Sequence, residues 1–205
     1  MGEEEIKKFF EAHSKIAFQK GDVIIRTEEE PVGVYYVSKG NIRMYTITED
    51  GKELTLNILK PGTYFPAIWA FTDIKNNYYF EAINNCDVYR APRIELLKFV
   101  EDNPAVLADI SRRLLRGMNS LIVRVQGLLE EDSYTKVKSV LSYLSGRFGK
   151  SDGDGKIVID LPVTHADIAN LGYMARETAS IELGKMQKQG LIDYKRKVIK
   201  IIKSE

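Results

Sequence analysis

Two adjacent side chains near the end of the sequence, Arg176 and Glu177, have the chemistry to read nucleic-acid bases. An arginine can donate two hydrogen bonds to guanine, and a glutamate can accept one from the amino group of cytosine. Ser180 and Ile181 follow one helical turn later, and an isoleucine can contact the methyl group of thymine. We predict that all four face base edges. The alternatives are a solvated surface pair for Arg176 and Glu177 and partial burial for Ile181.

A basic run follows this segment. Two short β-rich pieces, LID and VIKI, flank it and predict a hairpin. Such a hairpin beside a base-reading helix is a wing that contacts phosphates, although a charge run is more often a solvated turn. The residues that we expect at phosphates on this basis are Lys195, Arg196 and Lys197.

Residues for catalysis or metal binding are scarce. Cys86 is the only cysteine, and His13 and His165 are the only histidines. They have no recognisable metal-ligand spacing, and a single thiol excludes an intrachain disulfide and a multi-thiolate iron–sulfur cluster. No nucleophile, base and orienting group occur together, and no phosphate-holding glycine loop precedes a helix. We therefore do not expect an enzyme, and we interpret Cys86 as a buried apolar residue.

Two short helices are expected to position the base-reading residues. Thr164 and Asp167 have the spacing of a capping box, which predicts a helix over residues 165–172. A turn at Gly172 and Tyr173 leads to a second helix within residues 175–190. The polar groups gathered at its start suit the end of a recognition helix that enters the major groove. Its inward face is expected to be Ala179, Leu183 and Met186, and its outward face Arg176, Glu177, Ser180, Ile181 and Gly184.

A long helix is predicted upstream, from Pro104 to about Leu129. Its apolar residues are spaced by 4, 3, 4 and 3, as in the seam of a two-stranded coiled coil, which predicts a homodimer. The alternative is burial of these residues within one subunit. The seam residues are Leu114, Met118, Leu121, Val125 and Leu128. A second stripe, which we expect to pack on the chain's own sheets, is Leu115, Ile122 and Leu129.

The first part of the chain has the pattern of short strands. Between residues 21 and 88, β-rich runs alternate with Gly, Asp and Pro, and residues 49–52 predict a tight turn. This pattern favours a β-roll or sandwich, flanked by a short helix over residues 3–12. We expect an α+β fold with a jelly-roll-like β-roll, a long dimerisation helix and a C-terminal winged helix-turn-helix. The expected domains are residues 1–100, residues 101–131 and residues 132–205, and the expected hinge lies at residues 130–132.

The composition is that of a soluble, cytoplasmic protein with an asymmetric charge. Apolar residues make up 44% of the chain, and no apolar run approaches the roughly 18 residues of a membrane span. The acidic start does not resemble a secretory signal. Residues 133–205 carry 13 Lys and Arg against 8 Asp and Glu, a net of +5, whereas residues 1–132 carry 17 against 21, a net of −4. The basic end suggests a polyanionic partner.

The order of these elements resembles the family of the cyclic-AMP receptor protein and the fumarate–nitrate reductase regulator (CRP/FNR), which are bacterial transcription factors. The segments THADIAN, RET and KQGLI carry most of the resemblance, which extends over essentially the whole chain. It implies a homodimer on a near-palindromic site of double-stranded DNA that also contacts RNA polymerase. The alternative is a ligand-binding signalling module that acts through protein partners, which would show neither sequence preference nor salt sensitivity on DNA.

The resemblance also implies roles for single residues. Arg176 and Glu177 match the family's base-reading pair, whereas Ile181 stands where many members have arginine. Tyr173 stands where a turn glycine is common. The residues that match phosphate-contacting positions of the family are Thr164, His165 and Thr178.

The sensor region departs from the cyclic-nucleotide-binding members, which use a glutamate for the ribose and an arginine for the phosphate. The alignment places residues 66–68 at the first position and Asn76 and Asn77 at the second. A buried phosphate without its guanidinium would keep an uncompensated charge. We therefore expect no response to cyclic AMP, and we expect neither an iron–sulfur cluster nor haem. The candidate lining for a small-molecule effector, or alternatively plain core, is Tyr64, Phe65, Trp69, Tyr78 and Phe80.

Overall fold

The computed structural model describes residues 2–72, 74–153 and 155–202. The chain forms two compact units, of which the first contains residues 1–48 and 55–116 and the second residues 49–54 and 117–205. Helix α4 (Pro104–Leu128) belongs to both. Among the described residues, no helix is long and apolar enough to cross a lipid bilayer.

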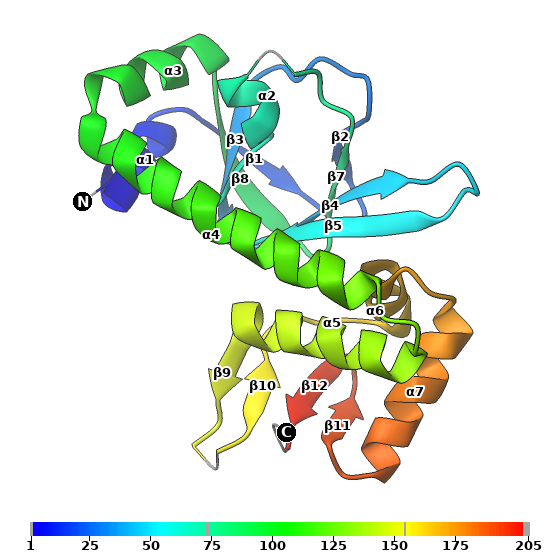
Figure 1. Ribbon diagram of the computed structural model, residues 1–205. Helices are drawn as coiled ribbons and strands as arrows, with labels where there is room; N and C mark the ends of the chain where they lie inside the picture. Colours follow the sequence, from blue (N-terminus) through cyan, green and yellow to red (C-terminus); the bar gives the residue numbers. More distant parts are fainter. Residues whose placement is uncertain (1, 73, 154, 203–205) are drawn as a thin grey trace. The chain divides into compact units, whose positions relative to one another are not determined.

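Two four-stranded sheets form the body of the first unit (Figure 1). One sheet has the strand order β1-β8-β3-β6 and the other β2-β7-β4-β5. The strands of the first sheet are β1 (Ser14–Phe18), β3 (Val34–Lys39), β6 (Tyr64–Phe65) and β8 (Cys86–Ala91). Those of the second sheet are β2 (Val23–Ile25), β4 (Ile42–Ile47), β5 (Glu53–Leu59) and β7 (Tyr79–Ala82). Strands distant in sequence are neighbours in both sheets, which confirms the predicted β-roll.

Aromatic and branched aliphatic residues fill the roll. Phe65 stacks on Tyr35 with ring centroids 5.2 Å apart and on Phe80 at 5.0 Å. A second cluster, which includes Phe10, Leu96 and other buried residues, lies beneath three helices. These helices are α1 (Gly2–Glu11), α2 (Ala67–Phe71) and α3 (Arg93–Asp102). The helix expected over residues 3–12 is α1, whereas α3 was not predicted.

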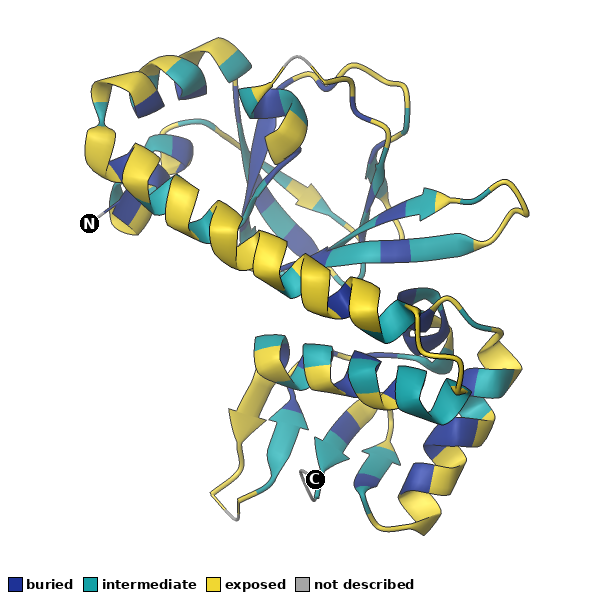
Figure 2. Ribbon diagram, viewed as in Figure 1, coloured by how far each residue is buried: buried dark blue, intermediate teal, exposed yellow. Residues whose placement is uncertain are grey.

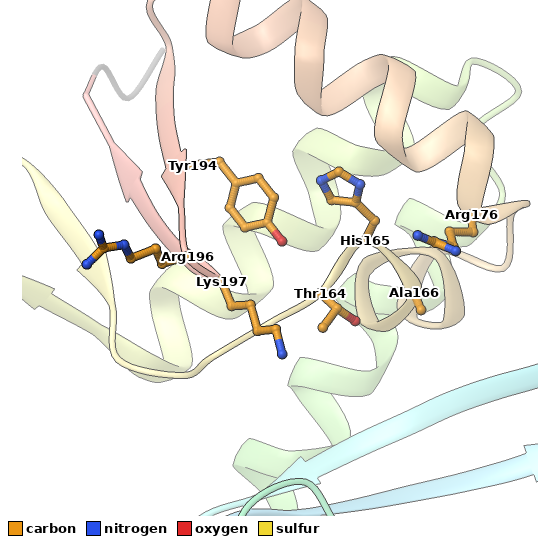
Figure 3. A pocket seen from close by; sticks show the side chains of 7 residues that line it. All are labelled: Thr164, His165, Ala166, Arg176, Tyr194, Arg196 and Lys197. Atoms are coloured by element: carbon orange, nitrogen blue, oxygen red, sulfur yellow. The ribbon is translucent and has the colours of Figure 1, made fainter.

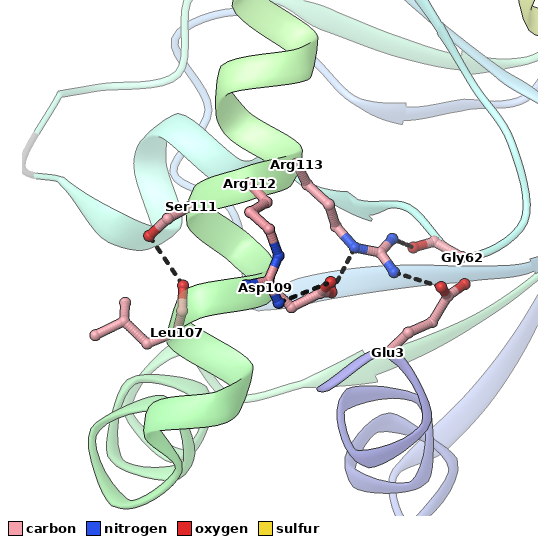
Figure 4. A network of polar contacts seen from close by, with 7 residues as sticks. All are labelled: Glu3, Gly62, Leu107, Asp109, Ser111, Arg112 and Arg113. Carbon is pink, nitrogen blue, oxygen red and sulfur yellow. Dashed lines mark hydrogen bonds and ion pairs between the residues drawn. The ribbon is translucent and has the colours of Figure 1, made fainter. Parts of the chain in front are cut away.

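Arg113 connects three segments of the first unit (Figure 4). Its guanidinium lies 2.6 Å from a carboxylate oxygen of Asp109 and 2.8 Å from one of Glu3, and it donates to the carbonyl oxygen of Gly62 at 3.2 Å. Burial alone would lower the pKa of Arg113, but the hydrogen bond and charge of Asp109 outweigh it, so the pKa lies above its ordinary value. The network fixes the first turns of α4 against α1 and the loop before β6.

The rest of α4 presents apolar side chains to solvent, as the yellow positions along this helix show in Figure 2. Of the predicted seam, Leu128 is half-buried, and four residues are exposed: Leu114, Met118, Leu121 and Val125. The expectation for the second stripe was wrong, because its residues are between 57% and 76% exposed: Leu115, Ile122 and Leu129. The reason is that α4 packs against the cluster beneath the helices through its first turns, with Val106 and Ile110.

The second unit combines the end of α4 and three complete helices with a four-stranded sheet of order β11-β12-β10-β9. The helices are α5 (Ser133–Phe148), α6 (His165–Gly172) and α7 (Arg176–Lys188). The strands are β9 (Gly149–Ser151), β10 (Ile157–Ile159), β11 (Ile192–Lys195) and β12 (Val198–Ile201). Helix α5 ends at Phe148, and strand β9 begins at the next residue. The α+β class and the winged helix-turn-helix are confirmed.

Asp132, in the predicted hinge, is the N-cap of α5. Its carboxylate accepts hydrogen bonds from the backbone N–H of Thr135 at 2.8 Å and from the Thr135 hydroxyl at 2.9 Å. These bonds hold the pKa of Asp132 below its ordinary value, since they favour the charged form. The break between α4 and α5 therefore contains a capped helix start.

Candidate nucleic-acid interface

Helix α6 begins at the predicted capping box. The Thr164 hydroxyl accepts from the backbone N–H of Asp167 at 3.2 Å, and the Asp167 carboxylate accepts from the Thr164 backbone N–H at 2.7 Å. The Thr164 hydroxyl also donates to this carboxylate at 2.7 Å. Two N–H groups that a helix start leaves free are thus paired. The box fixes where the first helix of the motif starts.

The turn between α6 and α7 places an uncommon conformation on Tyr173. This residue has φ 48° and ψ 56°, the left-handed region that favours glycine. The glycine stands one residue earlier, where a Cβ would lie 2.6 Å from Cε at the flexible end of the Met174 side chain and 3.4 Å from Val140 on α5. The left-handed position therefore falls on a tyrosine and not on the neighbouring glycine.

Helix α7 separates its residues between two faces as the sequence predicts. The inward residues are at most 2% exposed: Ala179, Leu183 and Met186. The outward residues that are exposed are Arg176, Glu177, Ile181 and Gly184. Ser180 and Thr178 are half-buried. The start of α7 thus presents a guanidinium, a carboxylate and an aliphatic side chain to solvent.

Glu182 holds α7 in place, and sequence reasoning missed it. Its side chain is buried, and one carboxylate oxygen accepts from the Ser133 hydroxyl at 3.1 Å and from the Lys185 ammonium at 2.9 Å. The other oxygen has no hydrogen-bond partner among the described residues. Position 182 lies in the inward stripe, three residues after Ala179, and this helical spacing is the signal that would have found it. The glutamate connects α7 to the first turn of α5.

The wing is the hairpin of β11 and β12. Its turn consists of Arg196, with φ 49°, and Lys197, with φ 67°. Positive φ at both central residues is the type I′ geometry that matches the strand twist, and Asn-Gly or Asp-Gly usually occupies it. Two long cationic residues stand here instead. The ammonium of Lys195, on β11, forms an ion pair with Asp193 at 3.1 Å.

A pocket of about 480 Å³ lies between the wing and the start of α6 (Figure 3). The residues that line it are Thr164, His165, Ala166, Arg176, Tyr194, Arg196 and Lys197. In Figure 3, Lys197 extends toward Thr164, whereas the guanidinium of Arg196 points away from both. The pocket thus joins one predicted base-reading residue, Arg176, to four predicted phosphate-contacting residues, and the other three base-reading residues lie outside it. Thr178 and Lys195 are not in its lining.

Two hydrogen bonds connect the wing to the backbone of Val163, the residue before the N-cap of α6. The Tyr194 hydroxyl donates to the Val163 carbonyl at 3.0 Å, and the Val163 N–H donates to the Lys197 carbonyl at 3.0 Å. The rings of His165 and Tyr194 lie 5.0 Å apart. Burial, and then the charge of Asp167, raises the pKa of Tyr194 above its ordinary value. The folded protein therefore favours the neutral phenol, which is the form that donates to Val163.

The chemistry of this pocket suits a phosphodiester. The start of a helix and the cationic side chains of Arg176 and Lys197 stand around one concavity, and both features attract an anion. Among the described residues, no group of three or more His, Cys, Asp or Glu side chains is arranged to hold a metal ion.

Comparisons with known proteins identify the same two parts. A cyclic nucleotide-binding domain model matches residues 15–103, and a Crp-like helix-turn-helix domain model matches residues 135–205. The global nitrogen regulator of Nostoc sp. is 26% identical over 192 residues, which cover 91% of this chain and 84% of that protein. The transcriptional regulator SdrP of Thermus thermophilus is 27% identical over 179 residues, which cover 86% and 84%. The chain belongs to the CRP/FNR family of transcription regulators.

Solved structures of CRP/FNR proteins share the fold. A regulator of this family from Thermus thermophilus has a TM-score of 0.68 at 24% identity, over 93% of this chain and 94% of that one. The c-di-GMP-responsive global regulator CLP of Xanthomonas campestris has a TM-score of 0.78 at 19% identity, over 98% and 99%. Like its CRP/FNR relatives, this chain is a DNA-binding transcription regulator.

The first unit of this CRP/FNR chain distributes the predicted effector aromatics between two clusters. Phe65 and Phe80 are at most 2% exposed inside the roll, and Tyr78 packs against them. Tyr64 and Trp69 pack in the cluster beneath the helices. The five residues are therefore not brought together as one lining, and an effector site built from all of them remains a prediction.

Asn76 has a structural task in the segment that resembles the phosphate-binding segment of nucleotide-binding CRP/FNR members. Its side chain is 5% exposed, and its amide donates to the carbonyl oxygens of Arg26 at 3.1 Å and Tyr78 at 2.8 Å. The backbone carbonyl oxygen of Asn76 accepts a hydrogen bond from the backbone N–H of Glu28 at 3.1 Å. Asn76 therefore joins two loops of the roll, whereas Asn77 is exposed.

Cys86 is 2% exposed in the core of the roll, at the start of β8. Its thiol donates to the carbonyl oxygens of Asn41 at 3.2 Å and Asn84 at 3.1 Å, and burial raises its pKa. The interpretation as a buried residue is confirmed.

Proposed function

We propose that this regulator is a homodimer that reads a near-palindromic DNA site with the exposed start of α7. Arg176, Glu177 and Ile181 face base edges in the major groove, with Ser180 beside them. The phosphate contacts come from the wing and the helix starts: Thr164, His165, Thr178, Lys195, Arg196 and Lys197. The observation that carries the proposal is the cationic pocket that joins Arg176, the start of α6 and the wing turn.

The exposed seam of α4 supports the dimer. Four large apolar side chains at coiled-coil spacing would otherwise remain in water on one helix. A second copy of α4 buries them and presents the two α7 helices to successive turns of the major groove, about 10 base pairs apart. Contact with RNA polymerase follows the family resemblance.

The roll does not respond to cyclic AMP in this proposal. The amide of Asn76 is already engaged by two backbone carbonyls, so the phosphate has no positive partner at this position. Calorimetry with cyclic AMP and the full chain is expected to show no binding, and micromolar binding would contradict this part of the proposal.

The decisive experiment is selection of bound duplexes from a random-sequence DNA pool, followed by affinity measurements across salt concentrations. We expect enrichment of a sequence with two related halves and an affinity that falls steeply as salt rises, because neutralised phosphates release counterions. No enrichment, together with salt-independent binding, would refute the proposal and favour a protein partner.

A further inference from the structure

The outward stripe of α7 contains one large apolar side chain. Glu177, Ile181, Gly184 and Lys188 follow one another by four, three and four residues, so they share a face, and all are exposed. Ile181 is 58% exposed. An aliphatic side chain that stays in water contributes little hydrophobic stabilisation to the free protein. Burial of Ile181 against a bound partner would therefore add stabilisation to the complex that the free protein lacks.

Gly184 lies three residues beyond Ile181 on this face. A Cβ at Gly184 would meet no heavy atom within 4 Å, and its backbone φ is not in the positive range. Neither packing nor conformation requires glycine, although glycine weakens a helix interior relative to alanine. An exposed glycine, which has no Cβ, leaves room for another molecule to approach the helix backbone closely on this face.

The partner that fits both residues is a thymine. The major groove presents hydrogen-bonding groups on every base pair, and its one apolar group is the 5-methyl of thymine. Isoleucine has no side-chain donor or acceptor, so it can discriminate bases only through such a group. We infer that Ile181 packs on a thymine methyl in each half-site and that Gly184 lets the helix backbone come close enough for this contact. The inference rests on the proposed entry of α7 into the major groove.

The test uses the duplex that wild-type protein selects from random DNA. Each thymine is replaced in turn by deoxyuridine, which keeps pairing with adenine and lacks only the methyl group. We expect about fourfold weaker binding for one thymine position in each half-site, the effect of one lost apolar carbon contact. Ile181→Ala should bind the thymine and uracil duplexes equally at that position. Ile94→Ala, which truncates an exposed isoleucine on α3, is the matched control and should retain the discrimination.

Gly184→Ala gives an independent readout. The added methyl has open space in the free protein and improves helix propensity, so the melting temperature should rise. Affinity for the selected duplex should fall severalfold, because the new Cβ occupies the space between helix and bases. A variant that is more stable and binds as tightly as wild type would overturn the role of Gly184.

The outcomes separate this inference from the proposed function. If no sequence is enriched and Arg176→Ala binds like wild type, the DNA-reading function itself fails. If binding is sequence-specific and depends on Arg176, but uracil is tolerated at every thymine or the selected sites contain no thymine, only the methyl contact is wrong. Discrimination that persists in Ile181→Ala would also refute the contact.

Discussion

The Tyr194 hydroxyl donates a hydrogen bond to the Val163 carbonyl at 3.0 Å, which attaches the wing to the residue before the N-cap of α6. The Val163 N–H returns a bond to the Lys197 carbonyl at 3.0 Å. The wing turn and the capping box are therefore held at a fixed separation, with the pocket between them. Disturbing one side should change DNA contacts on both.

Tyr194→Phe tests this connection. The ring and its packing against His165 remain, but the buried Val163 carbonyl loses a partner, so the free energy of unfolding should fall by about 1 kcal/mol. DNA affinity should fall as well, because the wing gains freedom. Tyr134→Phe, which removes an exposed hydrogen bond to Gln189, is the control in urea unfolding and fluorescence anisotropy. Wild-type DNA affinity in Tyr194→Phe would show that the bond does not position the wing.

Arg176→Ala should weaken binding to the selected duplex by about 1–3 kcal/mol and relax the base preference at one position of each half-site. Arg176→Lys should restore little, since an ammonium lacks the two-pronged geometry for guanine. Competition assays with all four bases at each position would show this. Lys188→Ala, at the exposed far end of α7, should leave base preference intact. An unchanged preference profile in Arg176→Ala would exclude base reading by this residue.

Replacing the wing turn by Arg196→Asn and Lys197→Gly together should separate stability from function. Both positions have positive φ, which costs a residue with a Cβ roughly 1 kcal/mol and glycine almost nothing. The double variant should therefore melt at a higher temperature. It should bind DNA more weakly, with a shallower dependence of affinity on salt, because two cations are gone. Equal salt dependence in wild type and variant would remove the wing from the phosphate contacts.

Tyr64→Phe should change stability only in alkali. Burial, opposed by the charge of Arg113 and supported by that of Asp109, raises the pKa of Tyr64 to about 12. The raised pKa means that the folded state favours the neutral phenol, so this stabilisation is complete below the unfolded pKa of about 10 and is lost as pH rises toward about 12. Phenylalanine has no ionisable hydroxyl, so the variant does not lose this stabilisation in alkali. Its unfolding free energy, from urea titrations between about pH 9 and about pH 11, should decline less steeply than that of wild type; parallel curves would contradict the assignment.

Leu121→Asp should convert the dimer to monomers, because a charge replaces the centre of the α4 seam. Sedimentation velocity should show half the mass, and affinity for the two-half-site duplex should collapse. Val123→Asp is matched in chemistry and lies on the opposite side of the helix, where the side chain is also exposed. If both variants stay dimeric, the seam is not the interface.

The features that could be predicted from the sequence are those that depend on residues close together in the chain. The Thr164–Asp167 box and the inward spacing of Ala179 and Leu183 depend on residues within two helical turns, so periodicity and capping rules sufficed. Helix α3 escaped notice because no side chain caps its start and only Leu96 and Val100 are buried along it. Helical spacing could have placed Glu182 on the inward face, but its hydrogen-bond partner Ser133 is distant in sequence and no local pattern names it. The partition of the aromatics between two clusters likewise depends on strand order, which no local pattern contains.

The hydrogen bonds of Asn76 restrict which substitutions this position of the β-roll can accept. Exchanging it for an arginine would break two hydrogen bonds to the carbonyls of Arg26 and Tyr78 and force a charge into a nearly closed space. The first step from this chain toward a cyclic-nucleotide receptor would therefore produce a less stable protein with no new ligand to compensate. A phosphate-binding side chain at this position would first require changes in the loop around Glu28 that make space for it. The hydrogen bonds of Asn76 therefore oppose that exchange.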